Sequence, residues 1–319
     1  IRYLRMSRGL GDVYKRQTRN SLILLLTAAI WGMAFVSQSK GMDYMHPFTF
    51  NGVRSLIGAA SILVYILISR KIAGDKAAPL DWKLNVKAGL LCGIFLTIAS
   101  TLQQFGIKYT SVGKAGFITT LYIIFVPMFG IFLKKKVAPV VWAAAVMAAV
   151  GMYLLCMTES LRLGAGDIMV FLCAIAFAIQ IMTVDHYAAR IDGAVVSCIQ
   201  FTVCGVVCCI GALIWGQPTF RQIQEGLGAL LYAGVLSCGV GYTLQIVGQK
   251  GLNPTVAALI MSLESVIATI SGWIAYKIGF LSTDQTLTPR QIAGCIIVFA
   301  AVILVQLPPE WFRFGKKNA

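Results

Sequence analysis

Charged side chains are scarce in this sequence, and histidine is almost absent. Only 12% of the 319 residues are charged, with 12 acidic residues and 2 His, whereas soluble domains carry about 25% charged residues. This shortage excludes an ordinary soluble domain. The chain also lacks a phosphate-binding loop of the G-x-x-x-x-G-K-S/T type, which excludes a process driven by ATP bound at such a loop.

Apolar residues take the place of the missing charges. They make up 58% of the chain, and the mean hydropathy is +0.80. A helix needs about 20 apolar residues to cross a bilayer, and ten runs of about that length occur. They cover residues 21–39, 47–69, 86–107, 112–133, 137–157, 167–187, 194–215, 227–249, 254–276 and 290–307. Because the connections are short, we predict an all-α polytopic membrane protein with ten transmembrane helices in the lipid bilayer.

The Lys and Arg residues behind the net charge of +15 are unevenly distributed. With ten spans, the tails 1–19 and 308–319 lie on the same side as the connection 70–87 and Lys134 to Lys136, and these segments hold most of the cations. The positive-inside rule therefore predicts that both termini are cytoplasmic, in a bacterial inner (plasma) membrane. Since this rule accounts for the basic charge, we expect no nucleic-acid partner.

Residues 1–17 contain RGLGDVYKRQ, which resembles translated sequencing-adapter sequence. We therefore expect this segment to be non-native. Without it, the excess of cations stays on the same side.

The second half of the chain repeats the first. Shifted by 142 positions, AGFITTLY (115–122) aligns with AALIMSLE (257–264), and shifted by 146, PFTFNGVRS (47–55) aligns with GAVVSCIQF (193–201). Residues 20–157 and 158–307 therefore form two copies of a five-span unit. Because five is odd, the second copy enters the membrane from the opposite side, as in the inverted repeats of secondary transporters.

Motifs in both halves carry a family resemblance. They are AAIWGMAFV (28–36), the start of the second span from Pro47 to Arg54, LQQFGIKYTSVGKAGFITTLYIIFVP (102–127) and NPTVAALIMSLESVIATISGWIAY (253–276). In this order they resemble the EamA family of the drug/metabolite transporter superfamily, over essentially residues 20–307. The resemblance implies a ten-span secondary transporter, with export of an amino acid or a related small metabolite as the first expectation. We expect no cofactor and no metal, and we consider a homodimer as the assembly.

The chain departs from the family pattern at two places. Glu264 is followed by Ser265 where the family commonly has Glu-Pro, and Lys134 and Lys277 stand where it often has an acid just after the fourth and ninth spans. The family's features at these positions are not carried over.

Arg54 lies inside the second span, where an arginine costs about 2.5–3.5 kcal/mol near the helix centre. Counted from Pro47, at about 1.5 Å per residue, it is roughly 10 Å deep. Three interpretations are open: the side chain snorkels to the headgroups, it forms a structural ion pair, or it faces a substrate cavity.

Glu264 is the only carboxylate deep in any span. Burial in a membrane disfavours the charged form of a carboxyl group. Glu264 could therefore carry a proton, act as the counter-ion of Arg54 or contact a substrate amine, and a neutral carboxyl that only packs between helices is the alternative.

Comparison of the two copies indicates which polar residues could line a central cavity, because such a cavity would be polar at equivalent depths in both copies. Gln103 aligns with Gln245, Tyr122 with Glu264 and Arg54 with Gln200. Amides also hold helices together by hydrogen bonds, so both interpretations stay open. We predict a substrate pathway formed by these side chains and by the aromatic rings of two more residues. Its members are Arg54, Gln103, Tyr122, Gln200, Gln245, Glu264, Trp31 and Tyr242.

Two other classes of membrane protein compete with a transporter. An intramembrane enzyme needs a nucleophile with a base, or several metal ligands, at one depth, and the spans offer one deep carboxylate and no deep His. A channel or scaffold without a transport cycle is the second alternative.

Overall fold

The computed structural model of the protein describes residues 2–74, 79–110, 112–134, 137–156, 164–281 and 286–306. These residues form helices and connections and contain no β-strand. The first repeat consists of α1 (Arg2–Gly41), α2 (Pro47–Ala73), α3 (Trp82–Tyr109), α4 (Val112–Thr120), α5 (Tyr122–Phe132) and α6 (Pro139–Cys156). The second repeat consists of α7 (Ala165–Tyr187), α8 (Gly193–Gly211) with the π-helical η2 (Ala212–Gly216), α9 (Phe220–Glu225), α10 (Leu227–Leu231), the π-helical η3 (Tyr232–Gly241), α11 (Tyr242–Gln249), α12 (Pro254–Met261), α13 (Leu263–Lys277) and α14 (Pro289–Gln306).

The predicted all-α membrane fold is confirmed. Eight helical segments of the described chain are long and apolar enough to cross a membrane, and α6 and α14 are shorter apolar helices. The ends of all ten agree with the predicted runs to within a few residues. Hydrophobic run length therefore locates the spans, because a helix is the form in which a single segment satisfies its own backbone inside lipid.

Short polar side chains and prolines fix where several of these helices begin. Pro47 and Pro254 occupy the first turns of α2 and α12, where a missing backbone N–H costs nothing. Asp81 accepts a hydrogen bond from the N–H of Leu84 at 3.0 Å, and Asp192 accepts one from the N–H of Ala194 at 2.9 Å. Such caps satisfy N–H groups that have no partner within the helix.

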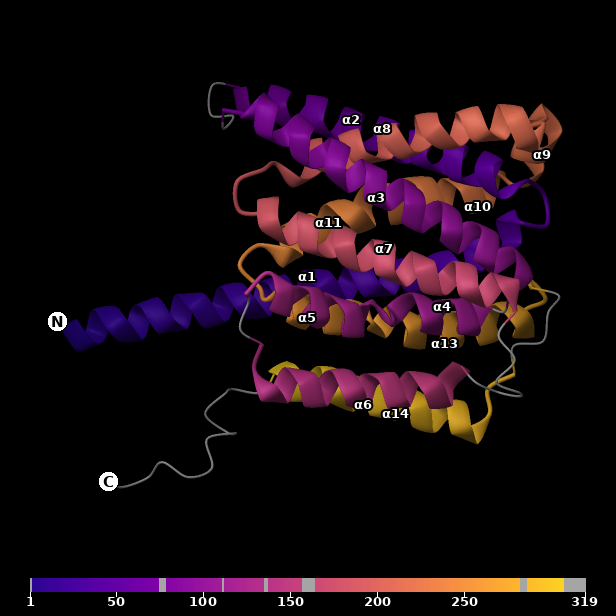
Figure 1. The fold of residues 1–319 in the computed structure, drawn as a ribbon. Helices are drawn as coiled ribbons and strands as arrows, with labels where there is room; N and C mark the ends of the chain where they lie inside the picture. The colour runs from indigo at the N-terminus through magenta and orange to yellow at the C-terminus, as the bar shows by residue number, and fades with distance from the viewer. Residues whose placement is uncertain are drawn as a thin grey trace.

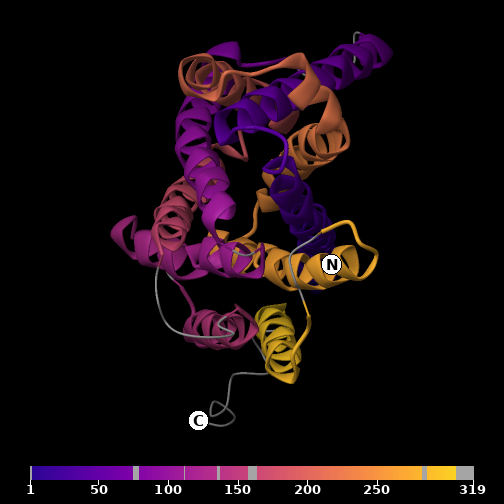
Figure 2. The same ribbon diagram turned by 90° about the vertical axis from the view of Figure 1, so that its right-hand side faces the viewer.

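The two repeats make equivalent contacts with each other. The largest contacts of first-repeat helices with the second repeat have counterparts between the equivalent second-repeat helices and the first repeat. In the first repeat α3 lies along α7, and in the second the equivalent span, α10 to α11, lies along α1. Likewise, α4 and α5 contact α7, while α12 and α13 contact α1. Helices α2 and α8 pair with each other, as do α6 and α14, which lie at one side of the bundle (Figures 1 and 2). This exchange is the pattern of two inverted five-helix repeats.

Two glycines show the equivalence of the repeats at atomic scale. A Cβ added at Gly106 would lie 2.9 Å from the carbonyl oxygen of Gly166, and one at Gly248 would lie 3.2 Å from that of Asn20. Gly106 and Gly248 are 142 positions apart, and Asn20 and Gly166 are 146 apart. Both contacts join one repeat to the other, so α3 with α7, and α11 with α1, come together at the distance that only a glycine permits.

The fourth and ninth spans are interrupted at positions that differ by one residue in the alignment of the two repeats. Between α4 and α5, Leu121 has φ −57° and ψ −10°, and between α12 and α13, Ser262 has φ −61° and ψ −16°. The carbonyl oxygen of each residue accepts a hydrogen bond from the N–H three positions later, Leu121 from Ile124 and Ser262 from Ser265. These tight turns bring Tyr122 and Glu264 to the start of the next helical segment, beside the interface between the repeats.

Candidate functional site

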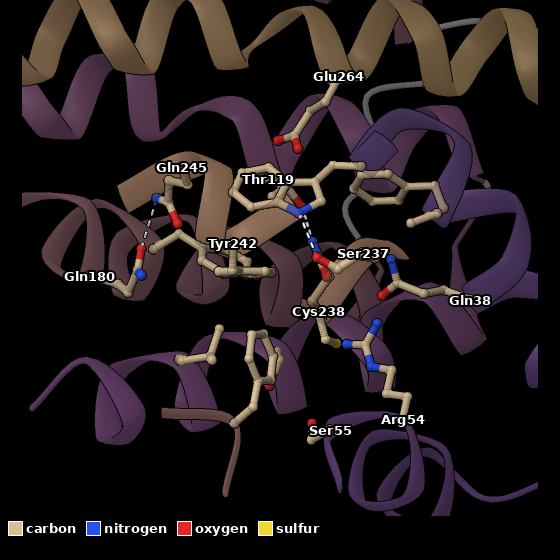
Figure 3. Close-up of a pocket in the computed structure, with 18 of the residues that line it drawn as sticks. Gln38, Arg54, Ser55, Thr119, Gln180, Ser237, Cys238, Tyr242, Gln245 and Glu264 are labelled. Carbon is tan, nitrogen blue, oxygen red and sulfur yellow. Dashed lines mark hydrogen bonds between the residues drawn. The ribbon is translucent and has the colours of Figure 1, made fainter. Parts of the chain in front are cut away.

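A cavity lies between the two repeats, near the centre of the bundle (Figure 3). The cavity volume is about 40 Å³ in this conformation, and the space between the surrounding atoms, including space open to the surroundings, is about 590 Å³. Its walls come from both repeats. They are formed by Trp31, Ala34, Phe35, Gln38, Arg54, Ser55, Leu96, Ser100, Gln103, Thr119, Tyr122, Phe177, Gln180, Ile181, Phe201, Ser237, Cys238, Tyr242, Gln245 and Glu264.

Most of these lining residues form pairs related by the internal repeat. The offset of 146 relates residues in the first two spans of each repeat, and the offset of 142 relates residues in the third and fourth. The pairs are Trp31 with Phe177, Ala34 with Gln180, Phe35 with Ile181, Ser55 with Phe201, Leu96 with Cys238, Ser100 with Tyr242, Gln103 with Gln245 and Tyr122 with Glu264. The cavity therefore lies on the pseudo-twofold axis between the repeats.

Tyr122 and Glu264 meet across this axis. The Tyr122 hydroxyl donates a hydrogen bond to Oε1 of Glu264 at 3.0 Å, and both side chains are buried. No Lys or Arg of the described chain forms an ion pair with Glu264, since the ion pairs there are Lys40–Asp43, Lys114–Asp167 and Arg221–Glu225. The carboxyl group is thus held by a phenol and faces the cavity.

Arg54 lies on the other side of the cavity from Glu264 (Figure 3). Its side chain is 5% exposed, and its Cζ is 5.4 Å from the centre of the Phe50 ring. The ion pair between Arg54 and Glu264, one of the predicted alternatives, is absent from the described residues. Of the three interpretations of Arg54, the position on a cavity matches the observed geometry.

The amides of Gln103 and Gln245 occupy equivalent places on the wall. Nε2 of Gln103 donates to Oγ1 of Thr119 at 3.3 Å, and Nε2 of Gln245 donates to Oε1 of Gln180 at 3.2 Å. Each amide is therefore oriented by a partner that also lines the cavity. Hydrogen bonding between helices and exposure to the cavity occur together, so the two interpretations of these amides do not exclude each other.

Gln200 lies outside the cavity, unlike the other seven residues predicted for the pathway. It is fully buried where α8 meets α3, and a Cβ at Gly93 of α3 would lie 3.2 Å from its Cα. Neither the oxygen nor the nitrogen of its amide has a hydrogen-bond partner in the described structure. The alignment of Arg54 with Gln200 thus predicts a shared depth but not a shared environment.

Aromatic rings form one wall of the cavity. The rings of Trp31 and Tyr242 are 4.5 Å apart between centroids, and Phe201 contacts Tyr242 edge to face at 4.9 Å. Nε1 of Trp31 donates to the carbonyl oxygen of Ser237 at 3.4 Å. Ser237 belongs to η3, and such π-helical segments often occur at functional sites. This wall can contact the apolar part of a ligand.

Comparison with known proteins decides the family. The model of the EamA-like transporter family matches the chain twice, over residues 19–157 and 164–307. The chain belongs to this family. The predicted resemblance is therefore confirmed, and the two matched segments correspond to the two copies seen in the sequence and in the fold.

Relatives in other organisms are also named as transporters. An uncharacterized transporter of Archaeoglobus fulgidus is 28% identical over 290 residues, which cover 89% of this chain and 84% of that protein. The uncharacterized transporter YwfM of Bacillus subtilis is 24% identical over 94% of this chain and 96% of that protein. A crystal structure covering 93% of this chain matches with a TM-score of 0.71 at 16% identity, which shows the fold alone.

Sequence reasoning missed several polar residues of this EamA-family cavity. Gln38, Gln180 and Ser237 line it, yet the search for polar positions that recur in both copies could not find Gln180, because Ala34 is its counterpart. A simpler signal was available: an isolated amide in an apolar span marks a side chain that should face protein or a cavity, whether or not it recurs.

Proposed function

We propose that this EamA-family protein is a secondary transporter that carries a small metabolite by alternating access between its two inverted repeats. The observation that carries the proposal is the cavity on the pseudo-twofold axis, lined in pairs by both repeats. Transporters of this architecture bind substrate near the midplane between the repeats and expose the site to each side in turn. The family match and the relatives named as transporters support the same function.

The direction and substrate class are part of the proposal. We infer export of an amino acid or a related compound from the bacterial cytoplasm, across the inner membrane, with both termini on the cytoplasmic side. An aromatic wall and two amides suit a molecule with an apolar body and polar groups. We place Glu264 as the proton-coupling group, since a buried carboxyl group on the axis can bind a proton in one conformation and release it in the other.

Saturable counterflow in proteoliposomes tests the proposal. Vesicles loaded with a high concentration of an unlabelled candidate substrate should accumulate the labelled compound transiently, and the initial rate should saturate. A carrier gives this result because the unlabelled compound inside competes with the labelled compound for the sites that would carry it out again. A channel conducts without saturable exchange, and a scaffold or enzyme gives no uptake, so either outcome would contradict the proposal.

A further inference from the structure

Arg54 is a buried cation that forms no ion pair and no side-chain hydrogen bond among the described residues. A guanidinium keeps its positive charge in proteins, and this one is 5% exposed within a membrane-spanning helix. Its Nε is buried and makes no hydrogen bond, and Arg54 is not part of any ion pair of the described chain. Removing such a charge from water is costly unless another group compensates it.

The protein groups around Arg54 do not supply that compensation. The ring of Phe50, 5.4 Å from Cζ, offers a cation–π contact, a weaker interaction than the ion pair that a buried charge requires. Gln38 lies at the same end of the cavity (Figure 3), and its Oε1 is likewise buried without a hydrogen bond. Both a donor and an acceptor of the cavity wall are thus left for a ligand.

Glu264 cannot be the missing anion in this conformation. It lies across the cavity from Arg54, and its Oε1 accepts the hydrogen bond of Tyr122. The counterpart of Arg54 in the second repeat is Gln200, which is buried where α8 meets α3 and does not line the cavity. The cavity therefore has one positive end, at α2, although most of its other wall residues form pairs related by the repeat.

The chemistry of a guanidinium specifies the class of group that fits this end. Its planar N–H donors match the two oxygens of a carboxylate in a bidentate pair. Among the described residues, Arg54 is the one Lys, Arg or His side chain that lines the cavity. A single positive charge balances a monoanion, whereas a phosphate monoester carries close to two negative charges near neutral pH.

We propose that Arg54 binds the carboxylate of the transported compound, which makes the substrate a monocarboxylate that enters with its carboxylate toward α2. This inference rests on the proposed function and names the substrate class of the same site. It gives Arg54 the role of a specificity-determining residue, with Gln38 placed to accept a hydrogen bond from a hydroxyl or amino group near the carboxylate.

Pairs of carboxylates and their amides test this assignment. Purified full-length protein is titrated with leucine and leucinamide, phenylalanine and phenylalaninamide, lactate and lactamide, and 4-methylvalerate and its amide, with the shift in thermal unfolding as the readout. We expect at least one carboxylate to bind and its amide to bind at least about tenfold more weakly.

Arg54→Gln should remove this preference for the carboxylate, and Arg54→Lys should keep part of it, because an ammonium holds the charge but not the planar donors. Arg190→Gln, on an exposed connection, should keep the preference.

Other results would overturn the assignment. An amide that binds as tightly as its carboxylate, or a carboxylate whose affinity is unchanged in Arg54→Gln, removes Arg54 from substrate recognition. Tighter binding of glycerol 3-phosphate than of every carboxylate, lost in Arg54→Gln, reassigns the site to phosphate. If only the neutral compounds show saturable counterflow, the inference fails and the proposed function stands. If none of the compounds shows saturable counterflow, both are overturned.

Discussion

The hydroxyl of Tyr122 donates a hydrogen bond to the carboxyl group of Glu264 at 3.0 Å, and the two residues occupy equivalent positions of the two repeats. Equivalent residues can touch only near the pseudo-twofold axis, so this bond marks the axis. Each of them also follows an interruption of its span, at Leu121 and at Ser262. The bond therefore joins the two interrupted spans, one from each repeat, at the wall of the cavity.

Glu264→Gln should uncouple transport from the proton gradient. Glutamine fits the same space and can still accept a hydrogen bond from Tyr122, but it cannot exchange a proton. We expect uptake driven by a pH gradient to fall by at least about tenfold, while counterflow without a gradient persists and loses its dependence on pH. The measurement is initial uptake into proteoliposomes at several pH values.

The control for this experiment is Glu225→Gln. Glu225 ends the short helix α9 outside the spans and pairs with exposed Arg221. Its replacement should leave both uptake and pH dependence unchanged. If the Glu264→Gln protein kept its rate and its pH dependence, Glu264 would not be the coupling group.

Tyr122→Phe should destabilise the protein by about 1–3 kcal/mol, because Glu264 would lose its only hydrogen bond from a side chain in the described structure. Thermal unfolding in detergent measures the change, with lipid-facing Tyr65→Phe, 60% exposed, as the matched control. The double variant Tyr122→Phe/Glu264→Ala should cost less than the sum of the two single changes, since each of them removes the same interaction. Additive costs would show that the bond contributes nothing to stability.

Gly106→Ala and Gly248→Ala should each destabilise the interface between the repeats by about 1–3 kcal/mol. An added methyl group at either glycine meets backbone or side-chain atoms of the other repeat within 2.9 Å. Gly228 in α10 is the control, since a Cβ there meets nothing within 4 Å, and Gly228→Ala should stabilise its helix by about 0.5–1 kcal/mol. Equal unfolding temperatures for the three alanine variants would contradict this view of the interface.

The spans could be predicted from the sequence because length and hydrophobicity decide them, but the interruptions within them could not. Pro127 is the residue of the fourth span that should bend a helix, yet it lies inside α5, and the interruption falls at Leu121. Leu121 and Ser262 carry no sequence signal for a tight turn. The segments on either side of these turns contact α7 and α1 of the other repeat, and such contacts exist only in the folded bundle.

The cavity could be predicted in part, because recurrence in the repeat reports depth but not the direction of a side chain. Gln103 and Gln245 share both the depth and the direction toward the cavity. Arg54 and Gln200 share only depth, since Gln200 packs with its Cα against Gly93 of α3 and does not line the cavity. Direction depends on how closely two particular helices approach, which the alignment of the two halves does not contain.

Asp167→Ala should destabilise the fold by about 1–3 kcal/mol, because it breaks a partly buried ion pair between the repeats. Asp167 at the start of α7 is 4% exposed as a side chain and lies 2.6 Å from Nζ of Lys114 in α4. It also accepts hydrogen bonds from the Thr110 hydroxyl and the Gly164 N–H, each at 2.8 Å. Glu225→Ala removes an exposed pair instead and should change the unfolding temperature little, whereas equal effects of the two variants would contradict the prediction.

His46 should make stability depend on pH below about 6.5. It lies in the connection before α2, where its Nδ1 accepts a hydrogen bond from the N–H of Phe48 at 3.4 Å and its ring contacts Phe105. Burial, and secondarily the charge of Lys108, lower the pKa of His46 from its ordinary value. A base with a lowered pKa in the folded state binds its proton more readily when unfolded, so stability is retained above pH 6.5 and lost as the pH falls below it.

Thermal unfolding between pH 8 and pH 5 measures this dependence. His46→Asn keeps a capping side chain for α2 but cannot be protonated, so the fall in unfolding temperature at acidic pH should be smaller than in the wild type. His186, exposed near the end of α7, provides the control, and His186→Asn should retain the wild-type dependence. If His46→Asn and the wild type lost the same stability between pH 7 and pH 5, the cap of α2 would not be the group that senses the proton.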